Sequence, residues 1–311
     1  MSNPVIYCFA AGQILLRKIS VNSTISPMQK SDQTARIRTS QVIKATAIIA
    51  SLSLGFWNRP EAAIAQTNQS LAPITSFCSS DLASRIDRII QQPRFRTARW
   101  GIVIKPIEKS TILYQRNPNL SLIPASNVKL LTTAAALQIA DRNPLANFQN
   151  WLTVVNRYSD NDRADALRRR IGGQTAIRSA LAGLGIDASS YAQVDGSGLS
   201  RSNRVTPSAL VTLLEAMFTA PQNELFYRSL AVAGVNGTLR NRFRNTLVQG
   251  NLHGKTGTLR GVRALSGYLE NPSYGTIAFS IVVNQPGQSG TALASAIDQI
   301  VLQTAQVDRC S

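Results

Sequence analysis

The chain has 311 residues, of which 44% are apolar, so its length and composition allow a domain-sized hydrophobic core. It carries 33 Lys and Arg against 16 Asp and Glu, a formal charge of +17, but only one histidine and three cysteines. A serine–histidine–aspartate relay would have to use His253, and a metal site would lack most of its usual ligands, so we expect neither a metal nor a cofactor.

The N-terminus has the pattern of a secretory signal. Lys44 precedes an apolar run at 45–57, and small residues follow at Ala63 and Ala65, which is the order of a charged region, an apolar region and a cleavage site. The run is too short to cross a bilayer core of about 30 Å. A buried helix or an uncleaved anchor is the alternative. Met28 would give a leader of ordinary length and is therefore a candidate for the true start.

Removal of residues 1–65 as a leader takes away seven of the 33 basic and two of the 16 acidic residues, which leaves 26 against 14, a net charge of +12. We expect the rest to be exported to the periplasm or cell envelope. There its positive charge favours peripheral association with an anionic wall polymer or membrane surface. The alternative is that the basic residues only form a solvated surface without a dedicated partner. Nucleic acid is not expected as a partner of an exported chain that has no basic run interleaved with aromatic residues.

Two cysteines, Cys78 and Cys310, stand near the two ends of the exported chain. An even pair in an oxidising compartment indicates a disulfide, so we expect one between them. Two unrelated free thiols are the alternative.

The elements follow from apolar spacing in chain order. A flexible lead-in is expected at 66–77, and a helix at 79–92, where four apolar residues recur at helical spacing behind a Ser and Asp cap. A hairpin and a helix from Pro124 come next, and four further helices fill the middle of the chain. The hairpin strands are expected at 98–107 and 110–115, the middle helices at 144–158, 163–171, 174–185 and 206–218, a short strand and loop at 191–203, late strands at 247–257, 261–269 and 276–284, and a closing helix at 290–305.

Strands therefore lie at both ends of the chain, with helices between them. Short turns join the late strands, which is the connection of an antiparallel sheet. We expect a single α/β domain over residues 78–311, whose sheet joins the N- and C-terminal parts and whose terminal helices cover one sheet face together.

The helix that begins at Pro124 carries a serine and a lysine of special interest. Ser126 and Lys129 share one face of the first turn, where free N–H groups and the helix dipole favour negative charge. The residues after Lys129 are apolar all round, which is typical of a buried helix, and burial lowers the pKa of an ammonium group. A neutral amine can take the proton of a neighbouring hydroxyl, so the pair predicts a nucleophile and its base. A serine cap and a lysine that reaches water are the alternative.

Two further motifs extend this chemistry. Ser159 and Asn161 belong to an S-D-N motif, and Lys255, Thr256 and Gly257 form a K-T-G motif. Together with S-x-x-K, in this order, they are the signature of serine penicillin-recognising enzymes. Ser159 can relay a proton to a leaving amine, and Asn161 can hold a substrate amide.

The K-T-G segment is expected to bind substrate. Lys255 adds a second cation, which lowers the pKa of Lys129 and attracts a carboxylate. Gly257 lets a substrate backbone lie close to the strand. The backbone N–H groups of Ser126 and Thr258 are candidates for an oxyanion hole.

From Cys78 onward the sequence resembles the D-alanyl-D-alanine carboxypeptidases of the penicillin-binding protein 4 type, peptidase family S13. The resemblance rests on IPASNVKLLTTAAAL, NRYSDND, VDGSGLSRSN, VNGTL and GKTGTLRGV. It implies an antiparallel sheet flanked by helices on both faces, the penicillin-binding or serine β-lactamase-like transpeptidase fold. It also implies action on peptidoglycan stem peptides, inhibition by β-lactams, an acyl-enzyme on Ser126 with Lys129 as base, and a structural role for residues 195–200.

One departure from that family stands out. Its members usually carry a long insertion between the first two motifs, whereas Ser126 and Ser159 are only 33 residues apart here. We expect the join near residues 141–150, and an incomplete or unusually open cleft is a possible consequence.

These features favour a serine carboxypeptidase, with endopeptidase action on cross-links as a further option. A wall- or penicillin-binding pseudoenzyme is one alternative. A β-lactamase is another, although no glutamate stands in an obvious motif to activate water. His253, two residues before Lys255, is expected to be a packed or solvated strand residue rather than a catalytic one.

Overall fold

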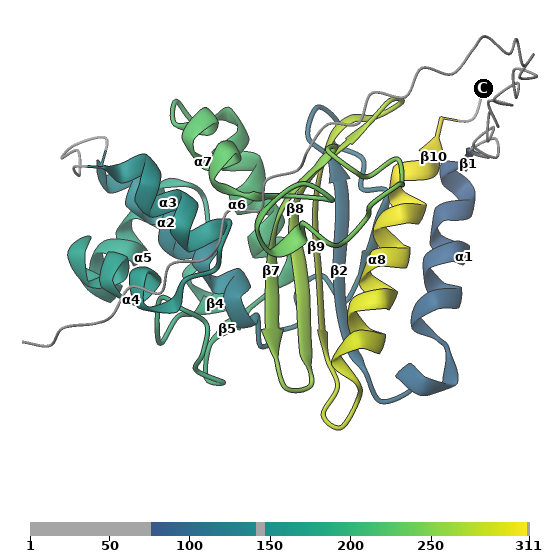
Figure 1. Cartoon of the computed structure of the whole chain (residues 1–311), viewed down its shortest axis with the longest axis horizontal. Helices are drawn as coiled ribbons and strands as arrows, with labels where there is room; N and C mark the ends of the chain where they lie inside the picture. The colour runs from purple at the N-terminus through teal and green to yellow at the C-terminus, as the bar shows by residue number, and fades with distance from the viewer. Residues whose placement is uncertain (1–75, 141–146, 310–311) are drawn as a thin grey trace, which may run out of the picture. The chain divides into compact units, whose positions relative to one another are not determined.

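The computed structural model describes residues 76–140 and 147–309, so the expected leader and most of the expected lead-in lie outside the described residues. Within them, a six-stranded sheet runs in the order β3–β2–β9–β8–β7–β6, and every neighbouring pair is antiparallel (Figure 1). The expectation of an antiparallel sheet built from both parts of the chain is confirmed. The strands are β2 (Arg99–Pro106), β3 (Tyr114–Arg116), β6 (Ala231–Val232), β7 (Leu252–Leu259), β8 (Val262–Asn271) and β9 (Gly275–Asn284).

Helices α1 (Ser79–Ile90) and α8 (Gly290–Gln306) lie side by side on one face of the sheet (Figure 1). Strand side chains alternate between the two faces, so Ile102 and Ile104 of β2 pack toward these helices while Val103 packs on the opposite face. The two terminal helices therefore cover one sheet face together, as the sequence predicts.

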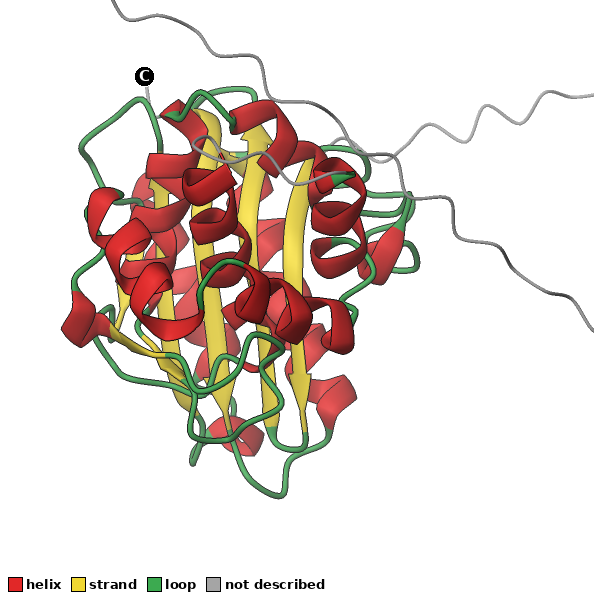
Figure 2. Ribbon diagram, turned by 90° about the vertical axis from the view of Figure 1, so that its left-hand side faces the viewer, coloured by secondary structure: helices red, strands yellow, loops and turns green. Residues whose placement is uncertain are grey.

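The other face is covered by helices from the middle of the chain, which lie in front of the strands in Figure 2. Helix α2 is central among them, and only two of its residues, Gln138 and Ile139, escape full burial. None of the helices in the described part is long and apolar enough to span a membrane. The helices of this face are α2 (Val128–Ala140), α3 (Phe148–Asn156), α4 (Asn161–Arg170), α5 (Gly173–Gly183), α6 (Pro207–Thr219) and α7 (Asn223–Ser229).

Most expected elements are present with shifted ends. The first late strand begins at Leu252 rather than at 247, because residues 247–251 form turns and the paired register with β8 starts only at Leu252. Helix α7 was not predicted, since its seven residues are too few to show a helical period. The loop expected at 191–203 lies between β4 (Tyr191–Ala192) and β5 (Arg204–Val205), which pair with each other.

The lead-in ends earlier than predicted. Phe77 belongs to β1 (Phe77–Cys78), which pairs in parallel with β10 (Val307–Asp308), and its ring is covered by the Arg85 guanidinium. This register sets Cys78 opposite Asp308, two residues before Cys310 in the sequence. Cys310 itself lies outside the described residues, so the disulfide stays a prediction.

Candidate active site

Ser126 lies in a short 3-10 turn, η2 (Ala125–Asn127), that runs directly into α2. Ala125 before it has a φ of +49°, a left-handed conformation that is uncommon for a residue with a Cβ. Asn127 fixes the turn to the sheet, because its Nδ2 donates to Ser266 Oγ of β8 at 2.7 Å. The nucleophile candidate therefore sits on a rigid bend at the head of a buried helix.

Two glycines allow this bend to pack closely. A Cβ on Gly257 would lie 2.5 Å from the Pro124 carbonyl oxygen, and one on Gly198 would lie 2.1 Å from the Ala125 carbonyl oxygen. Both distances are far below van der Waals contact, so both positions require glycine. The role of Gly257 thus differs from the expected one, because the backbone that approaches it is that of the protein itself.

Lys129 is fully buried, and its ammonium nitrogen contacts three oxygens. Nζ lies 3.0 Å from Ser126 Oγ and 2.8 Å from Asn161 Oδ1, and it also donates to the carbonyl oxygen of Ser197. The amide and carbonyl oxygens can only accept, whereas the serine hydroxyl can also donate. When Lys129 is neutral, its two N–H groups are therefore satisfied by Asn161 and Ser197, and its lone pair faces the Ser126 hydroxyl.

Burial makes this neutral form accessible. Desolvation lowers the pKa of Lys129 to about 8, although the carboxylates of Asp165, Asp195 and Asp160 act in the opposite direction. Burial, and then repulsion from Lys129, lower the pKa of Lys255 well below its usual value. The repulsion between the two lysines, expected from the sequence to lower the pKa of Lys129, thus lowers the pKa of Lys255 instead.

The carbonyl of Ser197 was missed by the sequence analysis as part of the site. It is held in place from α4, because Asp165 Oδ1 accepts from Gly196 N at 2.7 Å and from Ser197 N at 3.0 Å. Asp195 closes the same loop by accepting from Gly198 N at 2.6 Å. The expected structural role of residues 195–200 is therefore to hold the Ser197 carbonyl against the Lys129 ammonium.

Ser159 stands in the turn between α3 and α4 with a φ of +62°. Its Oγ accepts from Lys255 Nζ at 2.8 Å, and Lys255 also donates to the Thr256 carbonyl at 3.0 Å. The turn is fixed by Asp160, the N-cap of α4, whose side chain accepts from Arg163 N at 2.7 Å. The same cap makes Asn161 the first residue of α4 and directs it to Lys129.

These residues surround a pocket of about 250 Å³. Both lysines lie behind its walls rather than in them, and Thr238, unpredicted by sequence, bonds to Thr256 with 2.8 Å between their hydroxyl oxygens. Strand β6 pairs with β7 only at His253 and Gly254, so the next residues of β7 form a free edge within the described part of the chain. The walls include Ser126, Ser159, Asn161, Leu199, Thr256 and Thr258.

His253 packs against α7 and makes no side-chain hydrogen bond with the site residues among the described contacts. Its ring stacks on Tyr227, with 4.0 Å between the ring centroids, and burial lowers its pKa. It is therefore a packed strand residue. No cluster of three or more His, Cys, Asp or Glu suited to a metal occurs among the described residues.

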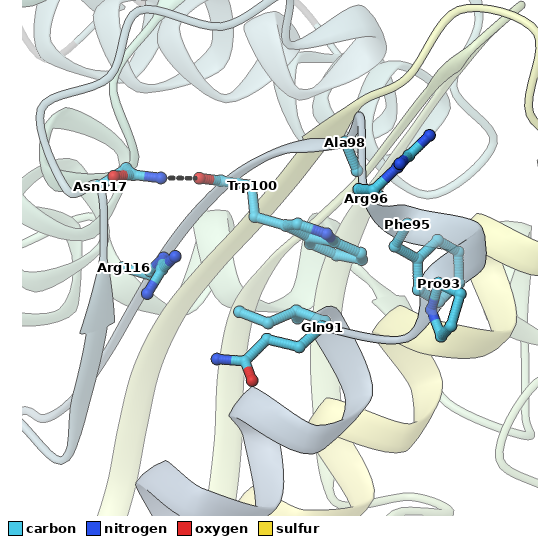
Figure 3. A pocket seen from close by; sticks show the side chains of 9 residues that line it. Gln91, Pro93, Phe95, Arg96, Ala98, Trp100, Arg116 and Asn117 are labelled. Carbon is cyan, nitrogen blue, oxygen red and sulfur yellow. Dashed lines mark hydrogen bonds between the residues drawn. The ribbon is translucent and has the colours of Figure 1, made fainter.

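A larger cavity, of about 470 Å³, lies elsewhere, between the end of α1 and strands β2 and β3 (Figure 3). Trp100 and Phe95 are among its lining residues and meet edge to face, and the Arg96 side chain points away from them (Figure 3). None of the predicted site residues lines it, so size alone does not mark the active site.

The family model for D-Ala-D-Ala carboxypeptidase 3 (S13) matches residues 82–147 and 143–307 of the chain. The two segments meet within the interval where the sequence analysis places the missing insertion. A D-alanyl-D-alanine carboxypeptidase of Actinomadura sp. (strain R39) is 42% identical over 177 residues, 52% of this chain and 32% of that protein. A penicillin-sensitive carboxypeptidase A of Dictyostelium discoideum is 42% identical over 127 residues, 38% and 24% of the two chains. The chain thus spans a third or less of the length of these two relatives.

Solved structures share the fold over a longer stretch. Penicillin-binding protein 4 of Haemophilus influenzae, complexed with a β-lactam, superposes with a TM-score of 0.60 at 15% identity, over 72% of this chain and 98% of that one. A β-lactamase from Chitinophaga pinensis gives 0.61 at 18% identity, over 71% and 97%. At such identities the likeness concerns the fold alone, and it confirms the predicted fold class.

Proposed function

Because this chain belongs to the D-Ala-D-Ala carboxypeptidase 3 (S13) family, we propose that it is a serine carboxypeptidase acting on peptidoglycan stem peptides that end in D-Ala-D-Ala. The observation that carries the proposal is the contact of Lys129 Nζ with Ser126 Oγ at 3.0 Å, at the wall of a pocket that also presents Asn161. In this role Ser126 is the nucleophile and Lys129 is its general base.

The chemistry follows from the contacts. The Ser126 proton moves to Lys129 as Oγ bonds to the scissile carbonyl carbon, whose oxygen takes up negative charge near the N–H groups of Ser126 and Thr258. Ser159 relays to the leaving amine the proton that Lys129 took up, the carbonyl forms again as the C–N bond breaks, and D-alanine departs. Water then hydrolyses the ester, which releases the shortened peptide and restores the hydroxyl.

The free edge of β7 supports a mode of substrate binding. Its unpaired N–H and C=O groups can add an extended peptide as a further strand. Asn161 on the opposite wall is within reach of such a peptide's amide groups, and Thr256 and Thr258 line the pocket along the edge. An internal cross-link would enter the same edge, so endopeptidase action would use the same residues.

Two alternatives differ in what they require. In a pseudoenzyme with an incomplete cleft the catalytic groups would be separated, whereas Ser126, Lys129, Ser159 and Lys255 lie in two contacting pairs despite the short link between the first two motifs. In a β-lactamase, water would have to cleave the penicilloyl ester rapidly.

The direct test is release of D-alanine from a synthetic peptide ending in Lys-D-Ala-D-Ala. The wild-type protein should release it and Ser126→Ala should not. Rapid turnover of penicillin without peptide hydrolysis would favour a β-lactamase instead. Binding of the peptide without its hydrolysis would favour a pseudoenzyme.

We infer from the sequence that the protein acts after export, in the periplasm or cell envelope. The support is the signal-like order of residues 44–65 and the net charge of +12 beyond it, which also suits peripheral contact with an anionic wall or membrane surface. N-terminal sequencing of the protein from the envelope fraction should start at Gln66. Recovery of the intact N-terminus from the cytosolic fraction alone would contradict export.

A further inference from the structure

A second cavity, of about 240 Å³, adjoins the catalytic pocket on the α8 side of β7. Thr238, Thr256 and Thr258 line both cavities, so they form a shared rim along the free edge of β7. A ligand seated against this edge therefore meets the side chains that line the second cavity.

The second cavity contains two guanidinium groups with different surroundings. Arg242 is neutralised by Asp298 of α8, whose Oδ1 accepts from Arg242 Nε at 3.0 Å. Arg263 has no carboxylate within ion-pair distance among the described residues. The cavity thus holds one positive charge that the surrounding protein leaves uncompensated.

Arg263 is placed beside the rim by the sheet register. It is the cross-strand partner of Thr258, and directly opposite residues on one sheet face have Cβ atoms about 5 Å apart. Its Nη1 donates to the carbonyl oxygens of Leu259 at 2.8 Å and Val262 at 2.7 Å. Within the described part of the chain, Nε and Nη2 have no acceptor, so a ligand can use them.

The head of α8 is shaped around this side chain. A Cβ on Gly290, the first residue of α8, would lie 1.8 Å from Arg263 Nη2, so the guanidinium packs directly against this glycine and would have to move if a larger residue stood there. Partial burial, together with repulsion from Arg242, lowers the pKa of Arg263. The group nevertheless remains charged, since an arginine does not deprotonate near neutral pH. A bound anion would offset both the loss of solvation of the guanidinium and its repulsion from Arg242.

The two buried lysines are less suited to meet an anion. Lys255 lies behind the pocket wall, and its ammonium is directed at Ser159 Oγ and the Thr256 carbonyl. The Lys129 ammonium already makes hydrogen bonds to oxygens of Ser126, Asn161 and Ser197. Among the cations described around the two cavities, Arg263 is the one that combines donors without an acceptor and the lack of a carboxylate partner, since Arg242 is paired with Asp298.

We propose that Arg263 is the carboxylate-recognising cation of this cleft, binding the free carboxylate of an acyl donor that is seated on Thr256 and Thr258 with its reactive carbonyl at Ser126. The inference rests on the proposed function and specifies its ligand. The preferred acyl donors carry a carboxylate next to the scissile amide, as a C-terminal D-amino acid and a penicillin both do.

Benzylpenicillin and its methyl ester provide a matched pair of probes, because they differ only in the carboxylate. The second-order rate constant for acylation would be measured with both. In Arg263→Gln the acylation rate constant should fall about tenfold to a hundredfold with the acid, which is the range for a charge-assisted hydrogen bond. With the ester it should fall less than about threefold. Arg263→Lys should fall between, since it keeps the charge without the planar fork.

Arg260→Gln is the control, because it removes one exposed arginine from the same β7–β8 turn and should leave both rates unchanged. The ester rate also reports on folding, since it needs an intact Ser126 site. An equal loss for acid and ester in Arg263→Gln would overturn the inference by assigning Arg263 a purely structural role, and so would unchanged rates for both. If the wild-type protein reacts with neither compound, the proposed function itself fails.

Discussion

The ammonium nitrogen of Lys255 lies 2.8 Å from the hydroxyl oxygen of Ser159, although 96 residues separate them in the chain. The contact joins the K-T-G strand to the S-D-N turn, behind the wall of the catalytic pocket. It ties Lys255 to the proposed proton relay, whereas the sequence suggests an anion-attracting role for this lysine.

Replacement of Lys255 should therefore affect the chemistry rather than carboxylate selection. Lys255→Ala should slow acylation by benzylpenicillin and by its methyl ester by a similar factor, about 10²–10⁴, as expected for loss of a proton-transfer partner. Stopped-flow acylation kinetics would measure both rates, with Lys109→Ala as the control, a half-buried lysine that does not line the pocket. A loss confined to the free acid would instead support the anion-attracting role.

The acylation rate should depend on the protonation of Lys129. The base acts in its neutral form, and its pKa is lowered to about 8, so the rate should fall about tenfold per pH unit below that value and level off above it. The second-order rate constant with penicillin, measured from pH 6 to 10, checks this. A rate already on its plateau at pH 6 would show that Lys129 is not the titrating base.

Asp165 should act as a positioning residue. Asp165→Asn removes a negative charge that raises the pKa of Lys129, so the rising limb of the pH profile should move to lower pH. Asp165→Ala also removes both acceptors for the Gly196 and Ser197 amides, and should lower the free energy of unfolding by about 1–3 kcal/mol.

Asp162→Asn is the matched control, because this exposed carboxylate lies in the first turn of the same helix. It should leave the pH profile in place. A shift as large as that of Asp165→Asn would mean that the profile responds to the overall charge of the surface and not to the residue that holds the Ser197 carbonyl.

The pairing of β1 with β10 strengthens the expectation of a disulfide between Cys78 and Cys310. Such a bond would close a loop of more than 200 residues, and Cys310→Ser should lower the free energy of unfolding by up to about 5 kcal/mol. Thiol titration of the exported protein without reductant should detect no free thiol. Two reactive thiols per chain would contradict the prediction.

The sequence was informative where side chains repeat or form motifs. The apolar run after Lys129 predicted a buried helix, and α2 is one. The late strands could be predicted from their β-branched residues and short turns. Short elements gave no comparable signal. Phe77 looks like part of a polar tail, and only its pairing with Val307, at the far end of the chain, makes it a strand residue.

The candidate site shows the same division. The side chains of Ser126, Lys129 and Ser159 could be named as candidates from three short motifs that occur in a fixed order. The Ser197 carbonyl could not, because every residue has a carbonyl group, and what distinguishes this one is Asp165 on a separate helix. The free donors of Arg263 likewise depend on the register of β8 against β7 and on the glycine at the start of α8.

Ser126 and Lys129 should behave as a unit. Ser126→Ala should abolish acylation. Lys129→Ala should reduce the acylation rate almost as far, because a nucleophile and its base do not contribute additively. Lys129→Arg should not restore the reaction, since a guanidinium cannot lose its proton near neutral pH. Residual acylation of Lys129→Ala near the wild-type rate would assign the base elsewhere.

The central claim is that Ser126 is the nucleophile of a working acyl-transfer site, and one measurement tests it most directly. Folded protein is treated with benzylpenicillin, and the intact mass and the peptide that carries the adduct are determined by mass spectrometry. The expected result is one penicilloyl group per chain, located on Ser126 and absent from Ser126→Ala. An adduct on another residue, or no adduct on a protein that is demonstrably folded, would contradict the claim.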